Sequence, residues 1–267
     1  MTAEVTAEMA VEVTAEFGNL SGQRAMVTGA SSGIGRAIAL ELARAGAEII
    51  VHCASASKQA QNVVSEIEQI GQKGTVVQQE FSSETNYEQF VQNVWTKEQS
   101  IDIWVNNAGV DLLTGDAARW NYQKKLQALL DVDITSTAML SHYVGQQMKQ
   151  AGKGLLLNIG WDQADRGMGG ASGELFALTK NSIMGLTRSL AVSLAPEVRV
   201  NGIAPGWILT KWGETASDEW QQRVLNETPL KRWGKPEDIA TLARFLASKQ
   251  AEFITGQIIN VNGGAVR

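Results

Sequence analysis

The feature that most constrains this chain is a glycine-rich segment near its start. Residues 28–35 read Thr-Gly-Ala-Ser-Ser-Gly-Ile-Gly, between an apolar run of strand length and a segment with helical periodicity. Gly29 permits a tight turn, Gly33 lets the backbone approach a pyrophosphate, and Gly35 allows close packing of the helix. Because a helix N-terminus offers free N–H groups to an anion, the segment predicts a dinucleotide site. The residues assigned to this part of the site are Gly29, Ser31, Ser32, Gly33, Ile34 and Gly35.

Apolar runs of strand length alternate with helical patterns along the rest of the chain. The expected strands cover residues 24–28, 48–53, 74–80, 101–106, 154–159, 198–204 and 257–261. The expected helices cover residues 34–45, 57–70, 86–98, 122–151, 174–193, 218–226 and 236–246. This alternation is typical of the α/β class and predicts a doubly wound Rossmann fold, with a seven-stranded parallel sheet and helices on both faces. Ligands of such folds bind at the carboxyl ends of the strands.

Length and composition indicate one large domain and limit its partners. The 267 residues, of which 44% are hydrophobic and 19% charged, suit a single globular domain over residues 18–267. Residues 1–17 repeat Thr-Ala-Glu from Thr2, Thr6 and Thr14, and we expect either a flexible acidic tail outside the fold or an arm that contacts a partner.

Charge and cysteine usage exclude several function classes. The net charge of −5 disfavours binding to nucleic acid, and one cysteine with two histidines disfavours a metal site and precludes an intrachain disulfide. No leader and no apolar run of membrane-spanning length is recognisable, so we expect a cytoplasmic protein that binds small molecules.

Three further segments agree with the glycine motif. They are Asn-Asn-Ala-Gly at 106–109, Asn-Gly-Ile-Ala-Pro-Gly at 201–206, and Ile-Thr-Gly-Gln at 254–257 followed by Asn-Gly-Gly at 262–264. Over about residues 20–267 the chain resembles the short-chain dehydrogenase/reductase family, and in overall texture its 3-oxoacyl-carrier-protein reductases. The resemblance implies that further cofactor contacts come from Glu80, Phe81, Asn107, Ala108, Gly109, Pro205, Gly206, Ile208 and Thr210.

The segment after the second strand bears on the choice of cofactor. Relatives that prefer NAD carry a carboxylate there, which accepts a hydrogen bond from the ribose 2′-hydroxyl. Residues 51–58 contain none, but Ser55, Ser57 and Lys58 could bind a 2′-phosphate. The sequence therefore predicts NADP(H) rather than NAD(H).

The positions that would carry catalysis depart from the family pattern. In the family a Tyr exchanges a proton with the substrate oxygen, a Lys four residues later binds the ribose, a Ser steadies the oxygen and an Asn holds a relay water. Here Phe176 precedes Lys180, Trp161 and Asp162 follow Gly160 at the strand end, and Asp133 replaces the Asn. Only the lysine is retained, so Lys180 is assigned to the ribose.

Three interpretations of these replacements remain open. The chain is an oxidoreductase with a substitute proton donor, a dinucleotide-binding protein without chemistry, or a partner subunit of an intact relative. The candidate donors are Asp133, Asp162 and Glu174, because a shielded carboxylic acid can stay protonated near neutral pH. Asp133 leads, because peroxisomal-type 2,4-dienoyl-CoA reductases also lack the Tyr and carry Asp there; pteridine reductases offer a weaker parallel for Asp162. The alternative for Asp133 is that it pairs with Lys180, stays ionised and is a structural counter-ion. Reduction of a conjugated double bond is the expected chemistry.

Five tryptophans fall in segments that the fold would place near the nicotinamide: Trp161, Trp207, Trp212, Trp220 and Trp233. They predict either a pocket for an aromatic or apolar small molecule or a packed helix over residues 218–226.

The resemblance also implies a homotetramer, assembled through the helices at 122–151 and 174–193 and the last strand. The apolar residues Met139, Leu140, Tyr143 and Val144 agree with this expectation.

Overall fold

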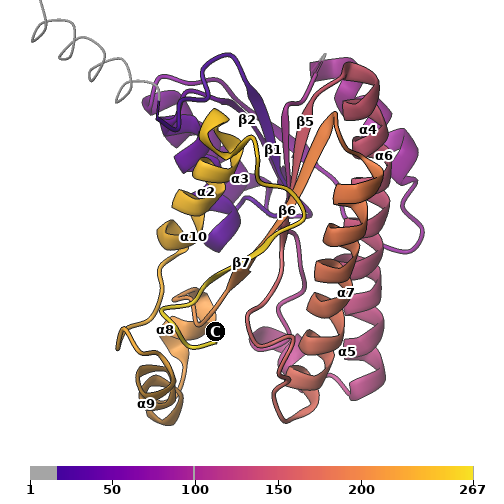
Figure 1. Cartoon of the computed structure of the whole chain (residues 1–267). Helices are drawn as coiled ribbons and strands as arrows, with labels where there is room; N and C mark the ends of the chain where they lie inside the picture. The colour runs from indigo at the N-terminus through magenta and orange to yellow at the C-terminus, as the bar shows by residue number, and fades with distance from the viewer. Residues whose placement is uncertain (1–16, 99, 267) are drawn as a thin grey trace, which may run out of the picture.

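Seven parallel strands form one sheet in the order β3-β2-β1-β4-β5-β6-β7 (Figure 1). The computed structural model describes residues 17–98 and 100–266, so nearly all of the predicted acidic tail lies outside the described residues. The strands are β1 (Arg24–Val27), β2 (Glu48–Cys53), β3 (Gly74–Gln78), β4 (Ile103–Asn106), β5 (Gly154–Ile159), β6 (Val198–Pro205) and β7 (Ile258–Val261). The predicted doubly wound fold is confirmed, and each expected strand overlaps an observed one.

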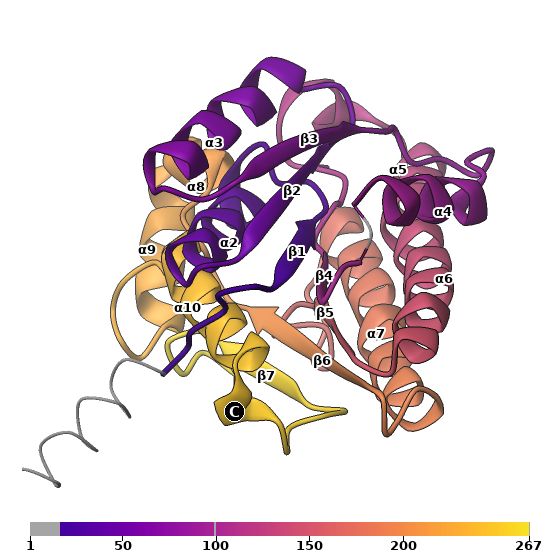
Figure 2. The ribbon, with the colours of Figure 1, turned by 90° about the horizontal axis from the view of Figure 1, so that it is seen from above.

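Helices cover both faces of the sheet (Figure 2). On one face lie α2 (Gly33–Arg44), α3 (Ser57–Gln69) and α10 (Pro236–Ala247), and on the other α4 (Tyr87–Glu98), α5 (Tyr122–Leu129), α6 (Ser136–Ala151) and α7 (Ala171–Ser193). Side chains alternate across each strand, so Ala25 and Val27 join one buried cluster while Met26 joins the other. Two short helices, α8 (Lys211–Thr215) and α9 (Asp218–Glu227), lie beyond the carboxyl ends of the strands, at the lower edge of Figure 1.

The helix expected over residues 122–151 is interrupted. A π-helical turn, Leu130–Thr135, separates α5 from α6. Asp133 lies in this turn with its side chain 1% exposed, and π-helical turns are frequent at functional sites. Helical periodicity alone does not reveal such a turn, because the apolar pattern continues through it. Likewise α7 begins at Ala171 rather than at residue 174, directly after Gly170 with its φ of +89°.

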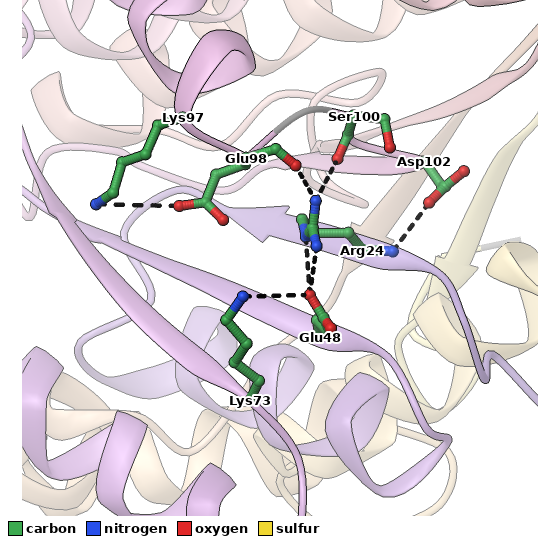
Figure 3. A network of polar contacts seen from close by, with 7 residues as sticks. All are labelled: Arg24, Glu48, Lys73, Lys97, Glu98, Ser100 and Asp102. Atoms are coloured by element: carbon green, nitrogen blue, oxygen red, sulfur yellow. Dashed lines mark hydrogen bonds and ion pairs between the residues drawn. The ribbon is translucent and has the colours of Figure 1, made fainter.

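A polar network joins the amino ends of the strands, opposite the expected ligand edge (Figure 3). The Arg24 guanidinium on β1 donates to Glu48 on β2 at 2.5 Å and to the carbonyl oxygens of Glu98 and Ser100. The Arg24 backbone N–H donates to Asp102, just before β4, at 3.0 Å. These contacts tie β1 to β2 and to the start of β4, and we assign the network to the fold rather than to the ligand site.

Within the part of the chain that the structure describes, no helix has both the length and the apolar character needed to cross a bilayer.

Candidate dinucleotide and active site

The glycine-rich loop after β1 approaches other backbone closely at two glycines. Gly29 has a φ of +63°, and a Cβ built there would lie 2.9 Å from the Ala108 Cα. A Cβ on Gly35 would lie 2.4 Å from both the Asn107 Nδ2 and the Gly29 carbonyl oxygen. Neither position has room for a side chain, so both glycines are required by the packing of the loop.

The start of α2 is open to a ligand. Ser32 and Gly33 are exposed, and in the described structure the Ser32 side chain makes no capping bond to the first turn. The first turn also contains no acidic residue. Gly33 faces Thr210, whose Cγ2 is 3.9 Å from a Cβ built on the glycine. Free N–H groups at the start of a twelve-residue helix suit a pyrophosphate.

The segment after β4 is bonded to the glycine-rich loop. The Asn107 side-chain amide donates to the carbonyl oxygens of Thr28 at 2.9 Å and Gly29 at 3.2 Å. The Thr28 hydroxyl accepts hydrogen bonds from the backbone N–H groups of Asn107 and Ala108, each at 2.9 Å. Thr28 was not among the predicted site residues, although its place directly before the first glycine is a usable signal.

The residues predicted to bind the 2′-phosphate lie together after β2 and at the start of α3. Ser55 and Lys58 are exposed, and the Ser57 hydroxyl donates to the Gln78 side chain at 2.5 Å. After β3, Glu80 is exposed, whereas Phe81 is buried.

Lys180 and Asp133 form a buried ion pair. The Lys180 Nζ lies 3.1 Å from the Asp133 Oδ2, with the side chains 13% and 1% exposed. The other carboxylate oxygen of Asp133 accepts the Val110 N–H at 2.9 Å, and a Cβ on Gly109 would lie 2.8 Å from Oδ2. Both oxygens of Asp133 therefore accept hydrogen bonds, which is the geometry of a counter-ion. The Lys180 ammonium keeps further N–H groups for a ligand.

Phe176 lies one helical turn before Lys180 and contacts Trp161. The two ring centroids are 6.3 Å apart and the rings are inclined at 62°. Phe176 also packs against an apolar cluster that includes Leu112, Leu129 and Leu175. The structure thus brings together the two aromatic residues that replace the expected tyrosine and serine, and neither carries a hydroxyl.

Asp162 is buried beside the segment that follows β6. Its side chain is 4% exposed, its Oδ2 accepts the Asn262 amide at 3.0 Å, and its backbone N–H donates to the Pro205 carbonyl oxygen. Its Oδ1 is buried without a hydrogen-bond partner among the described residues. Burial raises the pKa of Asp162 to about 6; the Asn262 side chain and the backbone N–H groups of Gln163 and Asp162 oppose the rise, and nearby Glu227 adds slightly to it.

The Asp162 carboxyl also lies next to a predicted cofactor residue. A Cβ on Gly206 would come within 3.3 Å of the Asp162 Oδ2. Asn262, which donates a hydrogen bond to this carboxylate, was not among the predicted site residues. Glu174, the third candidate donor, is exposed in the first turn of α7.

Four of the five tryptophans pack on one another. The ring centroids of Trp207, Trp212 and Trp220 are 5.4 to 6.1 Å apart, and Trp233 lies 5.9 Å from Trp212. The Trp207 indole N–H donates to Glu227 on α9 at 3.0 Å. This mutual packing agrees with the alternative of a packed helix at 218–226, while Trp161 lies apart and contacts Phe176.

Comparison with known proteins identifies relatives over almost the whole chain. The family model described as enoyl-(acyl carrier protein) reductase matches residues 29–266. The 3-oxoacyl-[acyl-carrier-protein] reductase of Staphylococcus epidermidis is 34% identical over 245 residues, which cover 90% of this chain and 97% of the relative. That of Synechocystis is 36% identical over 254 residues, with coverages of 92% and 98%.

A solved structure shares the fold at a TM-score of 0.83. It is that of a candidate NAD(P)-dependent gluconate 5-dehydrogenase of Beutenbergia cavernae, with NADP bound at low occupancy. Its sequence is 31% identical, and the match covers 93% of this chain and 98% of that one.

Proposed function

Because the chain belongs to the short-chain dehydrogenase/reductase family, as its motifs indicated, we propose that it is an NADP(H)-dependent reductase that works without the family's tyrosine. The family comprises oxidoreductases that bind a nicotinamide dinucleotide and act on small molecules. The proposed substrate is an apolar molecule with a conjugated double bond. The observation that carries the proposal is the buried, incompletely paired Asp162 carboxyl beside Gly206.

The residues present fit a nicotinamide dinucleotide. The uncapped start of α2 and the exposed Gly33 provide a place for the pyrophosphate, and Gly29 with Ala108 would border the adenosine. Lys180 would donate hydrogen bonds to the nicotinamide ribose, while Asp133 holds the ammonium in place. When bound, the reduced dinucleotide supplies the hydride.

Reduction of a conjugated double bond also needs a proton, and Asp162 is the donor that the geometry favours. Asp133 accepts hydrogen bonds on both oxygens and pairs with a lysine, so it serves as a counter-ion. Asp162 has one oxygen without a well-aligned hydrogen bond among the described residues and a pKa raised to about 6. Such a group can hold a proton near neutral pH and give it to one carbon of the conjugated system, while the hydride adds to another.

A panel of candidate substrates tests the proposed function. The protein is mixed with NADPH and with enoyl thioesters, dienoyl thioesters, pteridines and quinones, and NADPH oxidation is followed. We expect turnover with at least one conjugated substrate. Tight NADPH binding with no turnover across the panel would contradict the proposal.

A silent panel would favour the second candidate function, a dinucleotide-binding protein or partner subunit without chemistry. The observations that favour it are the Lys180–Asp133 ion pair and the contact between Phe176 and Trp161. A partner subunit would be distinguished by recovery of a complex with an intact relative. We also propose that the chain assembles as a homotetramer, and sedimentation showing a monomer at micromolar concentration would contradict this.

Cofactor preference gives a first prediction. We expect NADPH to bind about tenfold more tightly than NADH, because Ser55, Ser57 and Lys58 offer hydroxyls and an ammonium to the 2′-phosphate. The Lys58→Ala variant should lose most of this difference, whereas Lys249→Ala, near the amino ends of the strands, should keep it. Tryptophan fluorescence during titration measures the affinities of each protein for NADPH and for NADH. Equal affinities, or a higher affinity for NADH, in the unsubstituted protein would refute the preference.

Ketone reduction gives a second prediction. The unsubstituted protein should reduce simple ketones poorly, because Phe176 cannot protonate the alkoxide that forms, and a positioned acid contributes about 10²- to 10⁴-fold. Phe176→Tyr alone should raise the rate less than about tenfold, since Trp161 and Asp133 still replace the other two groups and such groups act as a unit. NADPH-dependent reduction of a simple ketone measures both. Rapid reduction by the unsubstituted protein would show that the tyrosine is dispensable here.

A further inference from the structure

His52 lies at the end of β2 with its side chain 1% exposed. Its Nδ1 accepts the Gly29 backbone N–H at 3.2 Å, and its Nε2 lies 2.9 Å from the Gln79 carbonyl oxygen. An amide N–H can only donate and a carbonyl oxygen can only accept. The ring proton is therefore on Nε2, and both ring nitrogens are bonded to backbone.

The same residue contacts the segment after β3 a second time, through its ring face. The rings of His52 and Phe81 are stacked, with centroids 4.4 Å apart and planes inclined at 10°. The His52 carbonyl oxygen also accepts the Ala30 N–H at 2.9 Å. His52 thus joins the glycine-rich loop after β1 to the segment that follows β3.

The His52 imidazole is neutral near pH 7. Burial lowers the pKa of His52 to about 4, although the bond to Gln79 opposes that change. Both backbone bonds are therefore available at neutral pH. The residues before it on β2 are Ile49, Ile50 and Val51, all buried, and a polar ring among them costs free energy unless both nitrogens are paired.

We propose that His52 is a positioning residue for the adenosine half of the dinucleotide, because it sets Gly29 and Phe81 relative to each other. This inference rests on the proposed cofactor site. Gly29 packs against Ala108, so displacing Gly29 would move both sides of the loop that borders the adenosine. The ring of His52 also stacks on Phe81. The position of Phe81 in turn sets where Glu80 and Phe81 can meet the adenosine.

The two ring nitrogens can be tested separately. In His52→Asn the side-chain oxygen lies near the place of Nδ1 and keeps an acceptor for Gly29, and in His52→Gln the amide nitrogen lies near the place of Nε2 and keeps a donor to Gln79. His52→Leu removes both. His142→Asn is the matched control, since His142 is exposed on α6 and bonds only to Gln146 among the described residues.

Calorimetric titration measures the dissociation constants for NADPH and for 2′-phospho-ADP-ribose, which lacks the nicotinamide. The titrations are done at a temperature where the variants are folded. We expect His52→Leu to weaken both ligands by the same factor, about tenfold. His52→Asn and His52→Gln should each fall between this variant and the unsubstituted protein, and His142→Asn should be unchanged.

A merely structural role gives a different pattern. The variants would then unfold at lower temperature while their dissociation constants stayed equal to that of the unsubstituted protein, and this result would overturn the inference. If His52→Leu does not fold, the affinities of His52→Asn and His52→Gln test the inference. Unchanged affinity in both variants refutes it. Failure of the unsubstituted protein to bind any dinucleotide would instead refute the proposed function and this inference with it.

Discussion

Replacing Gly35 by alanine is expected to weaken dinucleotide binding by about 10- to 100-fold, because overpacking of this kind costs about 1–3 kcal/mol. A Cβ there would lie 2.4 Å from the Gly29 carbonyl oxygen and from the Asn107 side-chain nitrogen. One of these groups is backbone, so the loop itself has to move. Its displacement would shift the start of α2, where the pyrophosphate is proposed to bind.

The control for this variant is Gly185→Ala. Gly185 lies inside α7, and a Cβ built there has nothing within 4 Å. Alanine should therefore leave dinucleotide binding unchanged and stabilise the helix by about 1 kcal/mol. The dissociation constant for NADPH and the unfolding temperature are measured for both variants. Unchanged binding by a folded Gly35→Ala variant would contradict the proposed cofactor site.

Replacing Asp162 by asparagine is expected to lower the rate with a reducible substrate by about 10²- to 10⁴-fold. The asparagine oxygen can still accept from Asn262, so the local packing is kept while the acidic proton is lost. Asp165→Asn is the matched control, because Asp165 is exposed in the same loop and should leave the rate unchanged. A rate that survives Asp162→Asn would assign the proton to another group.

The pH dependence of the unsubstituted protein and of Asp162→Asn tests the role of Asp162 independently. A proton donor acts only while protonated, so the rate should fall as pH rises above about 6, the raised pKa of Asp162.

The free energy of unfolding should also fall as pH rises. The favourable contribution of the buried, protonated carboxyl is complete below about pH 4 and is lost as pH rises through 6. Asp162→Asn should therefore be more stable than the unsubstituted protein above pH 7 by about 3 kcal/mol, with the difference vanishing in acid. Equal unfolding temperatures of the two proteins across this range would contradict the raised pKa.

The order of elements and the glycine-rich loop were predictable, because both follow from local patterns. Alternating apolar runs specify strands and helices, and the positions of Gly29 and Gly35 follow from a turn that admits no side chain. The π-helical turn at 130–135 was not predictable from periodicity, and the contacts that Asp133 makes from it, with Lys180 and the Val110 N–H, are tertiary.

The predicted site was least complete where a residue acts through partners far away in the sequence. His52 lies in an apolar strand, and only the folded structure brings Gly29 and Gln79 to its two nitrogens. Asn262 lies 100 residues from its partner Asp162. The ion pair of Asp133 with Lys180 agrees with the alternative in which Asp133 is a counter-ion, and only the folded structure shows which carboxylate is paired.

The most direct test of the proposed mechanism is a crystal structure with NADPH bound. We expect Lys180 at the nicotinamide ribose, with Asp133 still paired to it, and the Asp162 carboxyl on the side of the ring from which a substrate would approach C4. An Asp162 carboxyl screened from the nicotinamide by Gly206, with Asp133 released from Lys180 and facing C4, would contradict it.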